Sequence, residues 1–144
     1  MNYGNVAYLL CPFHQNLITM TTQEATMTTQ EVANRFYEMT QQGKWNEIQQ
    51  EFYADDAVSI EPEHSQGLQT VKGLDAIKKK GEDFNQMVEE MHGGYCSQPV
   101  VGGNYFSVAM GMDVTMKGMG RTKMDEIAVY CVKDGKITSE QFFY

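Results

Sequence analysis

The sequence contains few of the residues on which nucleic-acid contacts, membrane contacts and common cofactor sites depend. Among 144 residues there are only three histidines and three cysteines, and 11 lysines and arginines stand against 19 acidic residues. The net charge of −8 disfavours nucleic acid and anionic lipid surfaces as partners, because both bind to basic patches. The only basic run, KKK at 78–80, is interpreted as a solvated helix face.

Cysteine and histidine spacing argues against a metal site. Cys11, Cys96 and Cys131 have no ligand spacing and do not cluster with the histidines, so no zinc is predicted. Their odd number indicates a reducing, cytoplasmic setting. No apolar run approaches the ~20 residues of a membrane span, and no phosphate loop, GxSxG elbow or HExxH motif is present. We therefore predict neither a membrane partner nor a cofactor.

A heptapeptide written nearly twice marks the predicted start of the folded domain. The stretch MTTQEATMTTQEVA, at 20–33, contains the capping-box pattern Thr-x-x-Glu in each copy. Only the second copy leads into a helical apolar period, so the domain is expected to span 27–144. Residues 1–26 are interpreted as a dispensable extension, with an added strand or a partner contact through Tyr8, Leu9 and Leu10 as the alternative.

The apolar spacing changes from helical to alternating along the domain. Helical periods and glycine stops predict helices over 29–42, 45–52 and 74–91. Alternation predicts strands at 57–60, 95–103, 104–118, 120–135 and 136–144. Helices at the front and a meander at the back predict an α+β fold, in which a strongly curved sheet wraps over three helices and leaves a cone-shaped cavity.

Three stretches carry a resemblance to a known superfamily: QGKWNEIQQEFYADDAVSIEP, VKGLDAIKKKGEDF and VYCVKDGKITSEQFFY. In them the sequence resembles the SnoaL-like, or nuclear transport factor 2-like, superfamily over nearly all of 27–144. The resemblance implies a cystatin-like cone. It leaves the function open, because the superfamily includes isomerases, cyclases, dehydratases and binding domains without catalysis.

The resemblance also suggests roles for single residues. Glu61 stands where ketosteroid isomerase-like proteins carry a general base. Their helix-one tyrosine corresponds to Phe36, with Tyr37 beside it, which departs from the steroid-type oxyanion hole. Asp125 and Glu126 lie nearest to their late-strand acid. SnoaL-type cyclases are similar, with one late-strand acid doing most of the acid–base work.

The residues around the predicted strand end support Glu61 as a candidate. Ser59 and Glu61 share one face of that strand. A carboxylate at the mouth of an apolar cone would be desolvated and suited to general-base work, whereas a solvated glutamate before a turn is the alternative. His64 is either a site residue that relays a proton or binds an anion, or an ordinary surface histidine. His92 is expected to end the third helix, where its cation would suit the negative helix end, with a site role as the alternative.

Acids and tyrosines of the predicted meander complete the candidates. Asp113, on a face with small residues, is either a pocket acid or solvent-facing. Glu126 shares a face with Ala128 and Tyr130, where a charge is unusual. Tyr130 and Tyr144 are either hydrogen-bond donors to a ligand or ordinary core tyrosines. Tyr37 and Trp45 are the remaining predicted ligand contacts.

Two functions from different classes fit these features. The first is a cofactor-free enzyme that moves protons on a small, largely apolar carbonyl compound by isomerisation, cyclisation or dehydration. Glu61 would be the base and Glu126 or Asp113 the acid. The second is a non-catalytic module that binds a small molecule or dimerises. A homodimer through the outer sheet face is expected in either case, because that face carries more apolar residues than three helices can cover.

Overall fold

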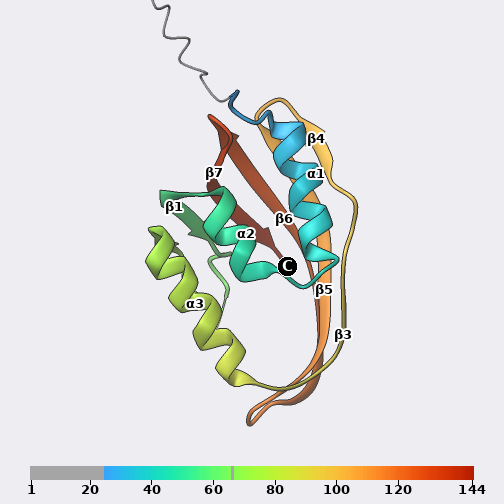
Figure 1. Cartoon of the computed structure of the whole chain (residues 1–144). Helices are drawn as coiled ribbons and strands as arrows, with labels where there is room; N and C mark the ends of the chain where they lie inside the picture. The colour runs from blue at the N-terminus through green and yellow to red at the C-terminus, as the bar shows by residue number, and fades with distance from the viewer. Residues whose placement is uncertain (1–24, 66) are drawn as a thin grey trace, which may run out of the picture.

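The computed structural model describes residues 25–65 and 67–144, and the interpretations of residues 1–24 lie outside these ranges. The described chain contains three helices and seven strands (Figure 1). The helices are α1 (Thr29–Thr40), α2 (Trp45–Phe52) and α3 (Leu74–Met87). The strands are β1 (Tyr53–Ile60), β2 (Val71–Lys72), β3 (Val88–Cys96), β4 (Val100–Gly102), β5 (Tyr105–Met116), β6 (Gly120–Lys133) and β7 (Lys136–Phe143).

The strands form one mixed sheet in the order β2-β1-β7-β6-β5-β3, and β4 also pairs with β5. The long antiparallel hairpin of β5 and β6 continues into β7, as the alternation predicts. β1 joins the sheet by pairing parallel to β7, with Ser59 opposite Glu140. The two-residue strand β2 lies where the sequence indicated a loop.

The capping box at the start of α1 is formed as predicted. The Thr28 hydroxyl accepts a hydrogen bond from the Glu31 amide at 3.2 Å, and the Glu31 carboxylate accepts one from the Thr28 amide at 2.7 Å. Two amides that the first turn would leave without partners are thereby satisfied, which sets where the helix begins.

The predicted end of the third helix at Met91 is wrong. α3 ends at Met87, and the chain passes directly into β3, in which Val88 pairs with Met116 and Met91 with Val114. The apolar residues at the end of the predicted helix also suit a strand, and pairing with the long β5 decides between the two. His92 therefore lies on a strand and has no helix end to cap.

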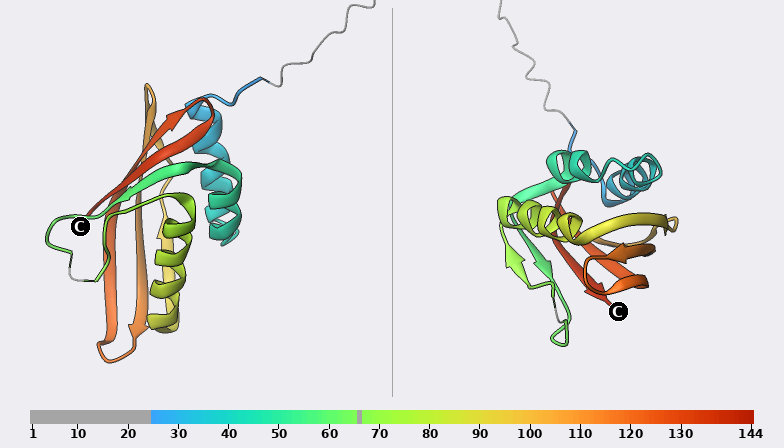
Figure 2. Two further views of the ribbon diagram at one scale, coloured as in Figure 1. Left: turned by 90° about the vertical axis from the view of Figure 1, so that its left-hand side faces the viewer. Right: turned by 90° about the horizontal axis from the view of Figure 1, so that it is seen from below.

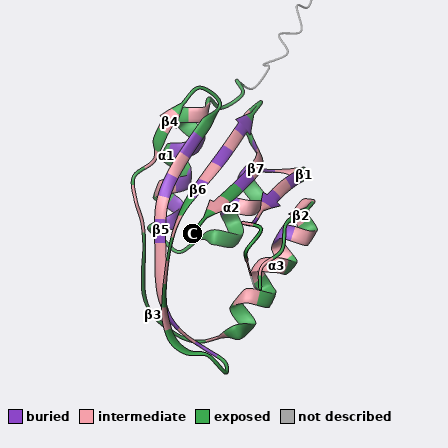
Figure 3. Cartoon of the chain, turned by 180° about the vertical axis from the view of Figure 1, so that it is seen from behind, coloured by how far each residue is buried: buried purple, intermediate pink, exposed green. Residues whose placement is uncertain are grey.

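The three helices lie on one side of the curved sheet, which we call the inner face (Figure 2). Phe36 of α1, Phe52 of α2 and Ile77 of α3 are at most 2% exposed and belong to the same core as Phe106 and Tyr130 of the sheet. Buried positions alternate with partly exposed ones along β5 (Figure 3). The predicted α+β architecture is confirmed. None of the helices in the described ranges is long and apolar enough to cross a membrane.

Gly111 of β5 is required by the close approach of its neighbours, and its replacement gives the first prediction. A Cβ atom there would lie 2.8 Å from the Met124 carbonyl oxygen and 2.6 Å from the Tyr95 ring, whereas one at Gly93 would meet nothing within 4 Å. We expect Gly111→Ala to lower the free energy of unfolding by about 1–3 kcal/mol, because overpacking shifts backbone as well as side chains. Urea unfolding measures this, with Gly93→Ala as the matched control. Equal effects of the two substitutions would contradict the close packing.

Candidate functional site

Four charged side chains from four parts of the chain converge on the inner face. Glu61 follows β1, Lys80 lies on α3, Glu126 on β6 and Glu140 on β7. Lys80 bonds Glu61 directly, and the charges of Glu61 and Glu140 both act on Glu126. We call Glu61, Glu126 and Glu140 the carboxylate cluster.

Glu61 is held by an ion pair inside the fold. Its Oε1 lies 2.6 Å from Lys80 Nζ, and the two side chains are only 4% and 14% exposed. The same Nζ donates to Ser59 Oγ at 2.5 Å and lies 5.4 Å from the centre of the Phe142 ring. Lys80 therefore compensates a carboxylate that would be costly to bury alone.

Glu140 is buried and is hydrogen-bonded to a buried tyrosine. It is 6% exposed and accepts a hydrogen bond from the hydroxyl of Tyr53, which is also buried. Burial raises the pKa of Glu140, while hydrogen bonds from Ser59 and Tyr53 and the charge of Lys80 act in the opposite direction. The pKa of Tyr53 is raised well above its usual value by burial and by the Glu140 charge. The proton of this pair therefore stays on the tyrosine.

Glu126 is an acid of the cluster that titrates near neutral pH. It is half-buried on the inner face, opposite Met110. Burial, and then the charges of Glu61 and Glu140, raise the pKa of Glu126 to about 7, against a smaller opposing effect of Lys80. A carboxyl group in this range can both donate and accept a proton at neutral pH.

Tyr144 borders the cluster on the side of the loop after β1, beside which the chain ends (Figure 2). Its hydroxyl lies 3.0 Å from Glu61 Oε2 and 2.8 Å from Ser65 Oγ, and burial is the largest cause that raises its pKa. His64 is exposed, with Nε2 2.9 Å from the Tyr144 carbonyl oxygen. His64 thus contacts the backbone of a site residue rather than the carboxylates.

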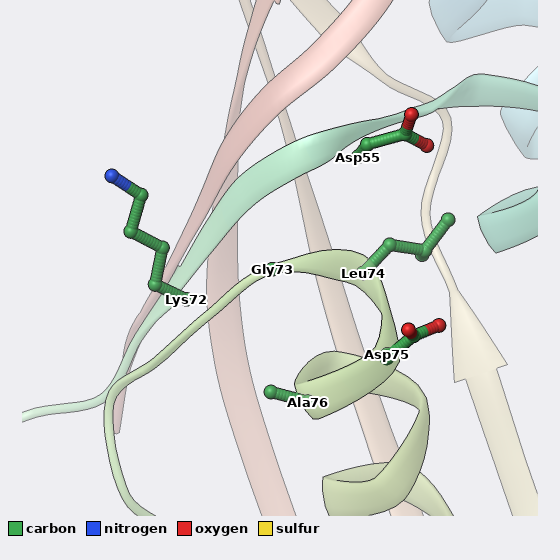
Figure 4. Close-up of a pocket in the computed structure, with 6 residues that line it drawn as sticks. All are labelled: Asp55, Lys72, Gly73, Leu74, Asp75 and Ala76. Atoms are coloured by element: carbon green, nitrogen blue, oxygen red, sulfur yellow. The ribbon is translucent and has the colours of Figure 1, made fainter.

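The surroundings of Glu61 differ from the apolar hollow expected from the sequence. Glu61 is buried on the inner side as expected, but its neighbours Lys80, Tyr144 and Thr70 are hydrogen-bonding groups. Two surface hollows of the described residues lie elsewhere. One of about 340 Å³ is lined by Asp55 and by Lys72 to Ala76 at the start of α3 (Figure 4), and one of about 580 Å³ lies between the start of α1 and the β6–β7 turn.

Two of the predicted site residues lie outside the cluster, on the outer face of the sheet. Asp113 pairs with Arg121 through two hydrogen bonds of 2.8 and 2.9 Å, and this contact lowers the pKa of Asp113. His92 Nε2 lies 2.7 Å from Thr115 Oγ1, and Nδ1 lies 3.7 Å from a Glu90 carboxylate oxygen. Asp113 thus lies away from the carboxylate cluster, on a strand that is paired on both sides.

The aromatic candidates are mainly part of the core. Tyr130 stacks on Phe106 with ring centroids 4.7 Å apart and contacts Phe36 at 4.8 Å. Burial raises its pKa well above the usual value. Trp45 is 44% exposed and meets Phe36 edge-on at 6.2 Å, and Tyr37 is half-buried on α1. Among the aromatic candidates, Tyr144 is the one with a hydrogen bond to the cluster.

Sequence reasoning did not assign a role to Lys80, Glu140, Ser59 or Tyr53 within the site. For Lys80 a signal was present. Leu74, Ile77 and Phe84 form the apolar stripe of α3, and position 80 lies three residues after Ile77 on the same side of a helix. Glu140 follows the same logic, since it shares a face of the last strand with Phe142.

The sequence matches the SnoaL-like domain family over residues 27–144. The chain belongs to this family. No curated protein matches the sequence. A crystal structure from Mesorhizobium loti, of a protein assigned as a SnoaL-like polyketide cyclase, is 36% identical. The match covers 82% of this chain and 100% of that one, with a TM-score of 0.76.

More distant solved structures share the fold of this SnoaL-like protein. A cystatin-like protein of unknown function from Xanthomonas campestris is 15% identical, with 81% and 90% of the two chains covered and a TM-score of 0.67. A ketosteroid isomerase-like protein from Catenulispora acidiphila, in complex with trimethylamine, is 18% identical, with 81% and 87% covered and a TM-score of 0.61. At these identities the likeness concerns the fold alone.

The raised pKa of Glu126 gives a prediction about stability and pH. The folded protein holds this proton up to about pH 7 and the unfolded chain only to about 4.5, so stability falls as the pH rises through this window. The Glu126→Gln variant lacks this dependence. Between pH 5 and pH 8, we expect the free energy of unfolding of Glu126→Gln to rise relative to that of the parent by on the order of 1–2 kcal/mol, a value already reduced for solvent screening. Urea unfolding at both values measures the difference. Glu82→Gln, an exposed change on α3, is the control, and parallel curves for Glu126→Gln and the parent would contradict the assignment.

Proposed function

We propose that this SnoaL-like protein is a cofactor-independent acid–base enzyme that acts on a small carbonyl compound by isomerisation, cyclisation or dehydration. The observation that supports this most directly is the convergence of three glutamates and a lysine on the inner face, with Glu126 as the member that can gain or lose a proton near pH 7. This corresponds to the SnoaL-type use of one late-strand acid.

Each member of the site has a proposed role. Glu126 exchanges the proton at a carbon next to the substrate carbonyl. Glu61, predicted as the base, is paired with Lys80 and supplies a fixed negative charge that raises the proton affinity of Glu126. The Tyr144 hydroxyl, at the border of the cluster, is placed to donate a hydrogen bond to a substrate oxygen.

Small-molecule binding by structural relatives is consistent with the proposed substrate size. The Catenulispora acidiphila protein binds trimethylamine, and TerC, 19% identical with a TM-score of 0.62, was co-crystallised with polyporic acid. The cluster is rich in acids, so we propose a neutral substrate rather than an anionic one.

Hydrogen–deuterium exchange tests the proposed chemistry without knowledge of the natural substrate. The probes are 2-tetralone and an aryl β-keto ester, both neutral at pH 7, in deuterated buffer at that pH, followed by proton NMR. We expect the protein to accelerate exchange next to the carbonyl of at least one probe, and Glu126→Gln to lower that rate by roughly 100-fold or more. Glu82→Gln is the matched control. Acceleration that survives in Glu126→Gln, or is absent with every probe, would contradict the acid–base proposal and favour the binding module.

A homodimer is the second part of the proposal, and the outer face of the sheet supports it. Tyr95, Tyr105, Ile127 and Phe143 are 45–54% exposed there, and Ile127 pairs with both Ala109 and Phe143 across neighbouring strands. Exposed apolar residues gathered on one face of a sheet are typical of an interface. We call these four residues the outer patch.

A charge in the outer patch is expected to separate the subunits. Ile127→Asp would desolvate an unpaired carboxylate in the interface, so the protein should run as a monomer by size-exclusion chromatography with light scattering. Met119→Asp, at a 70% exposed residue in the β5–β6 turn, is the matched control and should leave the mass of a dimer. A monomeric parent, or a dimer unchanged by Ile127→Asp, would rule out this interface.

A further inference from the structure

Lys80 is the unexpected member of the site. It is the third residue of the KKK run, which the sequence places on a solvated helix face, and its neighbour Lys79 follows that expectation. Lys79 has a 69% exposed side chain and pairs with Asp83 one turn further along α3. The Lys80 side chain is 14% exposed and points to the sheet. One run of identical residues thus contains a solvated cation and an enclosed one.

The contacts of Lys80 leave its ammonium group little freedom. Nζ is 2.6 Å from Glu61 Oε1 and 2.5 Å from Ser59 Oγ, with the Phe142 ring beside it. The side chain of its partner Glu61 is 4% exposed. If the ammonium group were removed, almost no water would reach the Glu61 carboxylate to solvate it. Glu126 lacks such enclosure, since it is only half-buried. Of these two acids, Glu61 is the one that has Lys80 as its direct counter-charge.

We propose that Lys80 is a positioning residue that decides which acid of the cluster carries the exchangeable proton. Its ammonium holds Glu61 as a carboxylate in one orientation, and the proton is thereby left to Glu126. The inference rests on the proposed acid–base function. It adds the residue that determines which glutamate is ionised and which carries the proton. Without the cation, Glu61 rather than the half-buried Glu126 is expected to take up the proton, because an unpaired carboxylate is disfavoured most where water is least available. Glu140, which is also buried, keeps its hydrogen bond from Tyr53 in that case.

The other charged and titratable groups around this pair do not replace Lys80. Glu140 of β7, Glu126 of β6, Tyr53 of β1 and Tyr144 after β7 face the cluster, and each is neutral or negative. Glu140 already accepts from Tyr53, and Tyr144 donates to Glu61 as a neutral hydroxyl. The loss of Lys80 therefore leaves Glu61 with a hydrogen bond but without a counter-charge.

Carboxyl titrations by carbon-13 NMR test the inference, with the full chain labelled in its glutamate carboxyl groups. The variants are Lys80→Met, Lys80→Arg, Glu61→Gln and the matched control Lys79→Met. If Lys80 distributes the roles, Lys80→Met moves the titration midpoint of Glu126 downward by about one pH unit, a tenfold loss of proton affinity, toward its value in Glu61→Gln. Lys80→Arg keeps the parental midpoint, and so does Lys79→Met.

If the Lys80 charge acted only directly on Glu126, the Glu126 titration midpoint would move in the opposite direction. The Lys80 charge by itself lowers the proton affinity of Glu126, so its removal with Glu61 still ionised would move the Glu126 midpoint upward. An upward shift or no shift would overturn the inference. If Lys80→Met does not fold, Lys80→Gln, which keeps a donor without the charge, gives the same two outcomes.

The titration is independent of the exchange assay. If no carbonyl probe exchanged, the proposed function would be contradicted, but a downward shift of the Glu126 titration midpoint in Lys80→Met would still support the role of Lys80. Conversely, exchange activity together with an upward shift would leave the function in place and remove Lys80 from its assigned role.

Discussion

The ion pair between Lys80 and Glu61 is the contact on which the inner face of this sheet depends. Three glutamates of that face lie where the helices cover the sheet, and repulsion among them would oppose folding if all were ionised. One ammonium group, 2.6 Å from Glu61, offsets part of that repulsion. Burial, as the largest cause, and then the remaining repulsion from Glu61 and Glu140 raise the pKa of Glu126 to about 7, so that protonation of Glu126 relieves the excess negative charge.

The same arrangement links stability to the proposed chemistry. A well-packed apolar core in place of the cluster would avoid the desolvation of charged groups. The protein instead combines a fully apolar region around Phe36, Phe106 and Tyr130 with an acidic region beside it on the same sheet. Perturbed acids of this kind are concentrated at functional sites, where proton affinity has to match the working pH. The cluster therefore supports the enzyme proposal more strongly than the aromatic residues do.

The two faces of the sheet divide the roles. The inner face carries the core and the carboxylate cluster, and the outer face carries the outer patch and the Asp113–Arg121 pair. Strand alternation produces this division, since neighbouring residues of β6 such as Glu126 and Ile127 point to opposite sides. A dimer through the outer patch would leave the cluster untouched, so the proposed assembly and the proposed chemistry can be tested independently.

Local sequence was sufficient for much of this architecture. The capping box begins α1, and alternation marks the long β5–β6 hairpin. Alternation also groups Ser59 with Glu61 on one strand and Glu126 with Tyr130 on another, because these signals depend on residues a few positions apart. The end of α3 and the partners of the acids were decided only in three dimensions. Val88 to Met91 suited either a helix or a strand until β5 offered a pairing partner. The enclosure of Lys80 beside the exposed Lys79, and the pairing of Lys80 with Glu61 nineteen residues away, depend on how α3 packs against β1. No local pattern of charges specifies that packing.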